Sequence, residues 1–266
     1  MNSQDFSSLK DRVVLITGGS GHIGSALTIA FLTQGCKVVT TDIHANRIDP
    51  EILGFESSGQ VRHRHIIADL RDLAAVAELP LQVQAAFGGL DIIVAGAAFT
   101  GDSMDDGWTV PFTQQDESLW ADALKINLTS NFTLVKAASP LLTESGNGSA
   151  IFLGSIYGMV APQPKLYEGL QLDNPAGYAV SKAGLTQLAQ WLASTMGPDV
   201  RVNTVTPGGI FRDQDPTFIE RYESRTPLGR MATEEDVVGP VLFLASDLSK
   251  YVTGINLVVD GGFSLW

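Results

Sequence analysis

Seven short apolar segments alternate with helical patterns along the chain, and this alternation limits the possible folds more than any other feature. Helical patterns lie near 22–34, 71–87, 114–143, 176–196 and 234–246. The apolar segments between them suit strands that are buried on both faces, and they are 12–17, 36–42, 64–69, 90–96, 149–155, 200–207 and 256–261. Such alternation predicts an α/β fold, a doubly wound parallel sheet of about seven strands with helices on both faces. Ligands are then expected at the carboxyl ends of the strands.

The chain of 266 residues is expected to form a single domain over 1–266, since it shows no internal repeat and no Pro/Gly/Ser linker. Three segments are expected to be insertions that cover the ligand edge: 99–113, 156–176 and 210–230. The first is polar and rich in Gly and Asp, and the second contains three prolines. Loops at that edge usually determine which substrate is bound.

Charge and cysteine content argue against several classes of protein. The net charge is −12 and the pI is near 4.6, which argues against nucleic acid or an anionic membrane as a partner and leaves a small-molecule substrate. Cys36 is the only cysteine, and no Cys/His cluster suggests a metal. Because the N-terminal segment has no apolar core and no apolar run is long enough to span a bilayer, a cytoplasmic protein is expected.

A glycine-rich segment directly follows the first predicted strand. Gly19, Gly21 and Gly24 fit the pattern G-x-G-x-x-G, in which the turn and the helix N-terminus bind a pyrophosphate. Asp42 ends the second strand, where a carboxylate accepts hydrogen bonds from a ribose 2′-hydroxyl and repels a 2′-phosphate. The sequence therefore predicts a Rossmann-type site for NAD rather than NADP, with Asp42 as a simple turn residue being the alternative. Asp69 ends the third strand and either reaches the adenine or caps the next helix.

Tyr178 and Lys182 stand four residues apart in a predicted helix, so their side chains share one face. Such a pair, taken alone, is most often an ordinary surface contact. Next to a dinucleotide site it has a chemical use, because a neighbouring ammonium stabilises a phenolate and lowers the pKa of the tyrosine. The tyrosine can then exchange a proton with a substrate alcohol.

Nearly the whole chain resembles the short-chain dehydrogenase/reductase family in its single-domain form. The matching segments occur in the family's order: TGGSGHIG, Asp42, ADL, KINL, GSIYG, YAVSK, VNTVTPGGI and VTGINLVVDGGF. The resemblance implies hydride exchange between a nicotinamide and an alcohol/carbonyl pair, with a catalytic tetrad of Asn127, Ser155, Tyr178 and Lys182. By the same resemblance, Ser155 holds the substrate oxygen, Lys182 also holds the nicotinamide ribose, and Asn127 holds a water that connects Lys182 to solvent.

The motif and the resemblance together predict the residues around each ligand. Cofactor contacts are expected at Gly18, Ser20, Gly21, His22, Ile23, Asp42, Asp69, Leu70, Ala95, Gly96, Ala97, Tyr178, Lys182, Pro207, Gly208, Ile210 and Arg212. Substrate contacts are expected at Ser155, Tyr157, Tyr167 and Tyr178. Within the insertions, Trp108 and Lys165 are also expected near the substrate.

Several positions depart from the family's pattern. The glycine spacing is closer to that of the branch that acts on nucleotide sugars than to the usual TGxxxGxG. The family's NNAG is replaced by 95–98, AGAA, so two asparagines that brace the neighbouring backbone are absent. Arg212 stands where a threonine often meets the nicotinamide, and it either binds an anionic group or is solvated. The stretch between Ser155 and Tyr178 is longer than in most relatives.

These observations favour an NAD-dependent oxidoreductase that interconverts a secondary alcohol and a ketone, with Tyr178 as general acid/base. A sugar or nucleotide sugar is the first choice of substrate, because aromatic and charged residues line the predicted insertions. An NADP-dependent reductase of the 3-oxoacyl type and a non-catalytic NAD(H)-binding regulator are the alternatives. By resemblance, the chain is expected to form a homotetramer or a homodimer through the helix at 114–143 and the helix that carries Tyr178.

Overall fold

The computed structural model describes residues 6–44, 52, 61–100, 107–170 and 173–266. Seven strands form one sheet in the order β3-β2-β1-β4-β5-β6-β7, and every neighbouring pair is parallel. The strands are β1 (Val13–Thr17), β2 (Lys37–Asp42), β3 (His63–Ile67), β4 (Ile92–Ala95), β5 (Gly148–Leu153), β6 (Val200–Pro207) and β7 (Asn256–Val259). The predicted doubly wound sheet is confirmed, and its chain order reverses between β1 and β4, which is where such sheets bind ligands.

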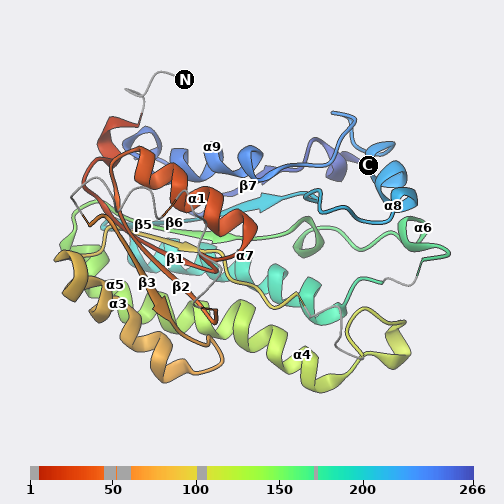
Figure 1. The fold of residues 1–266 in the computed structure, drawn as a ribbon, viewed down its shortest axis with the longest axis horizontal. Coiled ribbons are helices and arrows are strands. Elements are labelled where there is room, and N and C mark those ends of the chain that lie inside the picture. Colours follow the sequence, from red (N-terminus) through yellow and green to blue (C-terminus); the bar gives the residue numbers. More distant parts are fainter. Residues whose placement is uncertain (1–5, 45–51, 53–60, 101–106, 171–172) are drawn as a thin grey trace.

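Helices cover both faces of the sheet (Figure 1). On one face, α1 (His22–Thr33) packs beside α9 (Glu234–Ala245), and their apolar side chains share a core with β1, β4 and β5. On the other face, α3 (Leu73–Phe87), α5 (Ser130–Glu144) and α7 (Ala176–Met196) form a second core. Strands such as β1 and β4 are buried along their whole length, which explains why their sequences are continuously apolar.

The single long helix predicted over 114–143 is wrong in detail. A 3-10 turn (Phe112–Gln114) comes first, and α4 (Glu117–Leu124) begins after Asp116, whose carboxylate accepts hydrogen bonds from the amides of Ser118 and Leu119. A π-helical turn (Lys125–Thr129) then separates α4 from α5. Insertions of this kind frequently occur at functional sites, and this one contains Asn127.

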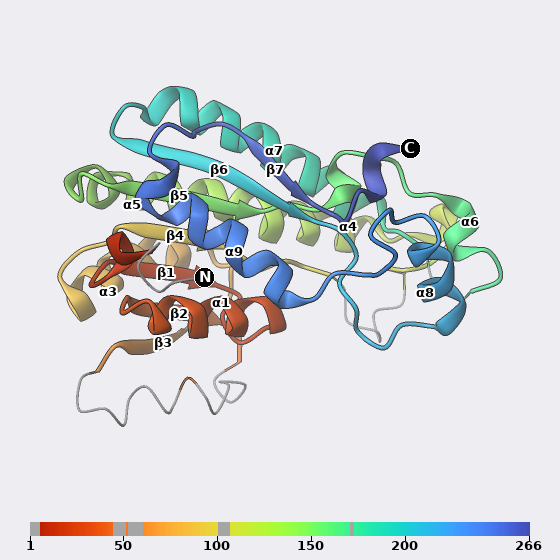
Figure 2. The ribbon, with the colours of Figure 1, turned by 90° about the horizontal axis from the view of Figure 1, so that it is seen from above.

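Two short helices that the sequence pattern did not predict lie beyond the carboxyl ends of the strands. They are α6 (Pro164–Tyr167) and α8 (Pro216–Glu223), and they gather with the C-terminal turn (Phe263–Leu265) at the right of Figure 2. Their buried side chains form a third, smaller core that includes Phe218, Tyr222 and Phe263. The segments 156–170 and 210–230 therefore contribute packed structure at the ligand edge. Residues 101–106 and 171–172 of the predicted insertions lie outside the described residues.

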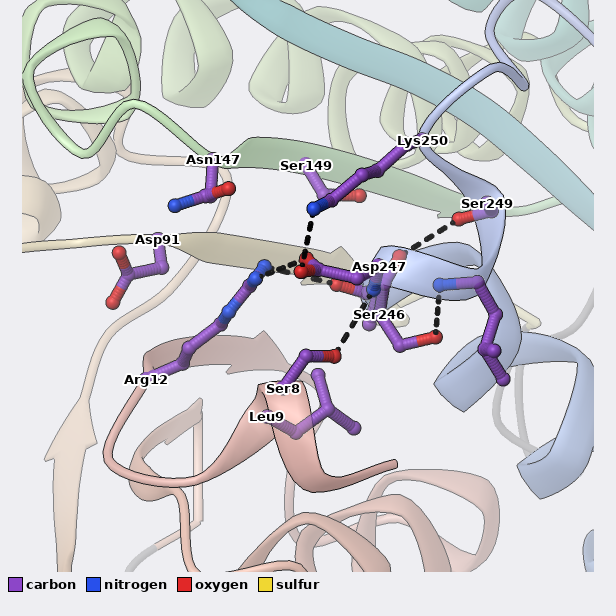
Figure 3. A network of polar contacts seen from close by, with 12 residues as sticks. Ser8, Leu9, Arg12, Asp91, Asn147, Ser149, Ser246, Asp247, Ser249 and Lys250 are labelled. Carbon is purple, nitrogen blue, oxygen red and sulfur yellow. Dashed lines mark hydrogen bonds and ion pairs between the residues drawn. The ribbon is translucent and has the colours of Figure 1, made fainter. Parts of the chain in front are cut away.

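A network of polar contacts links Arg12, the residue before β1, to the turn that follows α9 at the opposite edge of the sheet (Figure 3). The Arg12 guanidinium and the Lys250 ammonium both contact the Asp247 carboxylate, at 2.5 and 2.9 Å. These contacts hold the pKa of Asp247 below its usual range. Arg201 donates to Ser249 Oγ and to the carbonyl of Ser246, so two arginines stabilise the C-terminal end of the α9 dipole.

Within the described part of the chain, no helix is both long enough and apolar enough to cross a membrane. The same residues contain no group of three or more His, Cys, Asp or Glu side chains placed to hold a metal ion.

Candidate active site

Tyr178 and Lys182 lie in the first two turns of α7, and the structure brings them together as predicted. Lys182 Nζ lies 5.7 Å from the centroid of the Tyr178 ring. The lysine side chain is buried, and its Nζ donates a hydrogen bond to the carbonyl oxygen of Leu153 at 2.7 Å. Because Leu153 ends β5, this bond fixes the ammonium at the carboxyl edge of the sheet.

Ser155 follows β5 in an extended conformation and joins the pair. Its side chain is hydrogen-bonded to Tyr178, and its Oγ accepts from the amide of Tyr157 at 3.2 Å. The turn after Ser155 lies against the backbone of α7, where a Cβ on Gly158 would stand 2.7 Å from the carbonyl carbon of Lys182. Only glycine permits this approach, so Gly158 helps to set the distance between Ser155 and the tyrosine.

Burial shifts the pKa values of Tyr178 and Lys182. It raises the pKa of Tyr178, and the hydrogen bond from Ser155 opposes that rise. It also lowers the pKa of Lys182 to about 8. Desolvation disfavours the charged form of both groups. The pKa of Tyr178 is therefore raised in the protein alone, opposite to the lowering that the sequence led us to expect from the ammonium.

Asn127 is fully buried in the π-helical turn, and its side chain links two segments of the site. Its Oδ1 accepts from the amide of Phe99 at 2.6 Å, and its Nδ2 donates to the carbonyl of Phe99 and to Ser181 Oγ. Ser181 Oγ in turn donates to the carbonyl of Tyr178. Asn127 therefore joins the segment that follows β4 to the helix that carries Tyr178.

The glycine-rich loop has the shape of a phosphate cradle. Gly21 is the N-cap of α1, so no side chain competes for the amide groups of its first turn. A Cβ on Gly24 would lie 2.0 Å from the carbonyl oxygen of Gly18, so only glycine lets α1 pack this closely on the loop. Gly18, Ser20, His22 and Ile23 complete the loop. These residues fit the diphosphate of a dinucleotide.

Asp42 ends β2 beside this loop, as predicted. Its Oδ2 accepts from the amide of Ser20 at 3.2 Å, and its Oδ1 accepts from the amide of Ile43 at 2.8 Å. The carboxylate thus faces the loop. Each carboxylate oxygen of Asp42 can still accept a second hydrogen bond, and a ribose hydroxyl can donate it.

Asp69 does not cap α3. The N-cap residue is Asp72, whose carboxylate accepts from the amides of Ala74 and Ala75. Asp69 instead pairs with Arg71 at 2.8 Å, and the hydrogen bonds from Arg71 lower the pKa of Asp69. Its neighbour Leu70 is buried.

The remaining predicted cofactor residues lie at the ends of β4 and β6. Ala95, Gly96 and Ala97 adjoin β1, and Thr17 Oγ1 accepts from the amides of Gly96 and Ala97, both at 3.1 Å. Thr17 and Asn127 thus brace the backbone that lacks the family's two asparagines. Past Pro207 and Gly208, Ile210 forms a bridge with Ala232. Arg212 forms an ion pair with Glu234 at 2.7 Å and is not simply solvated.

Tyr157 and Tyr167 are joined through their hydroxyl groups, and Tyr157 is close enough to Tyr178 for the two phenols to interact electrostatically. The Tyr167 ring lies 5.6 Å from that of Phe218, and Phe218 in turn packs near Tyr222, which stacks on Phe263. Trp108 is buried edge-on against Phe99, so it stabilises its own segment rather than facing a substrate. Lys165 is exposed on α6.

Sequence reasoning missed several residues of this site. Ser181 and Thr17 are ordinary in sequence, and only the fold places their hydroxyls on the backbone of other elements. Glu234, the first residue of α9, pairs with Arg212 and lies 3.9 Å from His22 Nδ1. Asn174 hydrogen-bonds to Tyr167. Asn174 lies two residues before the helix that carries Tyr178, and this closeness in sequence was the one available signal.

The fold and this arrangement define a class of protein, and the comparisons with known sequences agree. The chain belongs to the short-chain dehydrogenase/reductase family: it matches the family described as enoyl-(acyl carrier protein) reductase over residues 19–264. It is an NAD(P)-dependent oxidoreductase that acts on an alcohol/ketone pair.

Individual relatives cover almost the whole chain. A probable galactose dehydrogenase of Rhizobium meliloti (strain 1021) is 33% identical over 98% of both chains. A 3-oxoacyl-[acyl-carrier-protein] reductase of Thermotoga maritima is 30% identical over 96% of this chain and 98% of its own. Among solved structures, a short-chain dehydrogenase of Leptospira borgpetersenii with bound NAD+ is 34% identical, covers 98% of this chain and 95% of its own, and has a TM-score of 0.84.

Proposed function

We propose that this protein is an NAD-dependent dehydrogenase that interconverts a secondary alcohol and a ketone, with Tyr178 as the general acid/base. One observation carries the proposal: Tyr178 is hydrogen-bonded to Ser155 and lies beside the buried Lys182, at the sheet edge next to the glycine-rich loop. A proton acceptor, an oxygen-binding hydroxyl and a cation are thus close together where a dinucleotide fits.

Each residue has a defined task in this reaction. Ser155 donates a hydrogen bond to the substrate oxygen and holds it beside Tyr178. In its phenolate form Tyr178 takes the proton of the alcohol during oxidation, and in its phenol form it returns that proton during reduction. Lys182 supplies positive charge that stabilises the developing phenolate, and Asn127 positions α7 through Ser181. The glycine-rich loop and Asp42 hold the dinucleotide, whose oxidised nicotinamide accepts the hydride.

A sugar or polyol is the proposed substrate class. The Tyr157 and Tyr167 hydroxyls form a polar pair, and Tyr157 lies close to Tyr178, so this pair suits a ligand with several hydroxyl groups. The name of the Rhizobium relative, a probable galactose dehydrogenase, supports this choice. The name of the Thermotoga relative, a 3-oxoacyl-[acyl-carrier-protein] reductase, supports the acyl substrate of the alternative function.

A substrate panel tests the proposed function. Absorbance at 340 nm is followed with NAD or NADP and with aldoses, polyols, nucleotide sugars, simple secondary alcohols and a 3-oxoacyl thioester. Oxidation of a sugar or polyol with NAD is expected. Reduction of only the thioester with NADPH would support the 3-oxoacyl reductase. Tight NAD(H) binding without turnover of any compound would support the non-catalytic regulator.

The choice of cofactor is tested by Asp42→Ala. Removing the carboxylate beside Ser20 removes the repulsion of a 2′-phosphate and an acceptor for the ribose. We expect the ratio of kcat/KM with NAD to that with NADP to fall by about tenfold or more, mostly through KM. Asp11→Ala, which changes an exposed carboxylate on the opposite edge of the sheet, is the control. An unchanged ratio in Asp42→Ala would refute the assignment of NAD specificity to Asp42.

Each protomer is proposed to be a single domain. A second copy of the chain is proposed to cover an apolar surface on α5 and α7 of that domain. Phe132 and Trp191 are 41% and 55% exposed there, and they flank a groove that is also lined by Leu128 and Leu188. Burying such a surface favours association. Light scattering is expected to give the mass of a tetramer or dimer; a monomer at micromolar concentration would contradict this proposal.

A further inference from the structure

A small polar cluster lies beside the proposed catalytic tyrosine, between the turn that follows Ser155 and the start of α7. Tyr157, Tyr167 and Asn174 form it, and each is partly exposed. The hydroxyls of Tyr157 and Tyr167 share a hydrogen bond, and the Asn174 side chain bonds to Tyr167. Tyr157 is near enough to Tyr178 for the two phenol groups to interact electrostatically.

The Tyr157 and Tyr167 hydroxyls carry two protons and share one hydrogen bond, in which either oxygen can be the donor. One O–H of the pair therefore stays free to donate to a ligand. Asn174 Oδ1 has no hydrogen-bond partner among the described residues, so the bond between Asn174 and Tyr167 is donated by the amide N–H of Asn174.

Two hydrogen-bonding positions of the cluster are left over. One hydroxyl proton of the Tyr157–Tyr167 pair has no acceptor among the described residues, and burial raises the pKa of both phenols, so the pair remains a donor at neutral pH. Asn174 Oδ1 is shielded from solvent and has no donor within the described part of the chain. An unpaired buried acceptor destabilises the free protein, and a ligand that pairs with it recovers that free energy.

A free donor next to a free acceptor matches one functional group in particular. An alcohol hydroxyl accepts one hydrogen bond and donates another, whereas a ketone or ester oxygen only accepts and an ammonium only donates. Contacts with α8 hold Tyr167 in place. The Tyr167 ring packs on Phe218. Arg221 donates hydrogen bonds to the carbonyls of Leu166 and Glu168 on either side of Tyr167.

We propose that Tyr167 and Asn174 form a subsite that recognises a second hydroxyl of the substrate, next to the one that Ser155 and Tyr178 bind. The Tyr167 hydroxyl donates to this second oxygen, and the second hydroxyl donates to Asn174 Oδ1. Tyr157 is a positioning residue that orients Tyr167. The subsite rests on the proposed function, and it makes a polyhydroxy compound, rather than a simple alcohol, the substrate class.

A series of four-carbon alcohols tests the subsite. 2-Butanol, 2,3-butanediol and threitol share a carbon chain and differ in their number of hydroxyls. We expect kcat/KM with NAD to rise by about tenfold or more from 2-butanol to the diol. In Tyr167→Phe and in Asn174→Ala that advantage falls to less than about threefold, while kcat/KM for 2-butanol changes little. If a larger sugar is turned over faster, the same comparison is made with that sugar and its deoxy analogues.

Tyr167→Phe keeps the ring against Phe218, and thermal unfolding of both variants checks that they fold. Tyr251→Phe, at a fully exposed tyrosine, is the control that leaves every rate unchanged. The subsite is refuted if the diol has no advantage in the wild type, or if Tyr167→Phe lowers kcat/KM equally for diol and mono-alcohol. If no alcohol or sugar is oxidised with either cofactor, the proposed function itself fails, and the subsite fails with it.

Discussion

Replacing Tyr178 by phenylalanine is expected to lower kcat for alcohol oxidation by about 10³-fold while leaving the binding of NAD nearly unchanged. General acid/base catalysis contributes roughly 10²–10⁴-fold in enzymes, and the Tyr178 phenol oxygen is the group that we propose exchanges the substrate proton. The phenylalanine ring keeps the packing at the start of α7. The measurement pairs initial rates at 340 nm with calorimetric titration of NAD.

Two results would separate the tyrosine's chemical role from a structural one. Tyr251→Phe, at an exposed position, should retain the wild-type rate. If Tyr178→Phe loses NAD binding and stability together with its rate, the hydroxyl acts in holding the fold, and if it retains more than about a tenth of the wild-type kcat, another group is the acid/base.

Lys182→Met is expected to have the second largest effect, a fall of about 10²-fold in kcat/KM. Removing a positive charge beside an acid raises the pKa of that acid by about 1–3 units, so far less of Tyr178 reaches the phenolate during the reaction. Methionine fills most of the volume of the lysine stem. Lys136→Met, on the exposed surface of α5, is the matched control.

The same variant has a pH signature in stability. Burial lowers the pKa of Lys182 to about 8, from an ordinary value of 10.5 in the unfolded chain. Between these values the unfolded chain binds one more proton than the folded protein, so the contribution of Lys182 to the unfolding free energy rises with pH. Relative to Lys182→Met, the wild type should therefore gain about 1–2 kcal/mol between pH 7.5 and pH 9.5 in urea unfolding. A difference that does not vary with pH would show that the lysine pKa is not lowered.

The sheet could be predicted from the sequence because its strands are buried on both faces and are therefore continuously apolar. All seven strands lie within a few residues of their predicted bounds. The helices at the ligand edge were harder to predict. The helix α6 has four residues and no apolar period of its own, and it depends on Phe218 and its neighbours for burial. The π-helical turn at Asn127 is stabilised by contacts with Phe99 and Ser181, which lie 28 and 54 residues away in sequence.

The candidate site was predictable where a residue's role depends on local spacing. Tyr178 and Lys182 are one helical turn apart, and the glycine-rich loop is continuous in sequence. Side chains whose partners lie far along the chain carried no such signal: Arg212 meets Glu234 only because the fold brings the end of β6 to the start of α9. The hydrogen bond between Tyr157 and Tyr167 could not be predicted either, because no sequence pattern indicates contact between two tyrosines ten residues apart.

Transfer of deuterium tests the central claim most directly. The alcohol that the wild-type protein oxidises fastest is prepared with deuterium on its carbinol carbon and is incubated with NAD. If Tyr178 takes the hydroxyl proton while the carbinol hydrogen leaves as hydride, the NADH formed carries the deuterium and is one mass unit heavier, and the deuterium is absent from the solvent. NADH of ordinary mass, or NAD that stays bound and unreduced with every alcohol, would contradict the assignment of this site to hydride transfer.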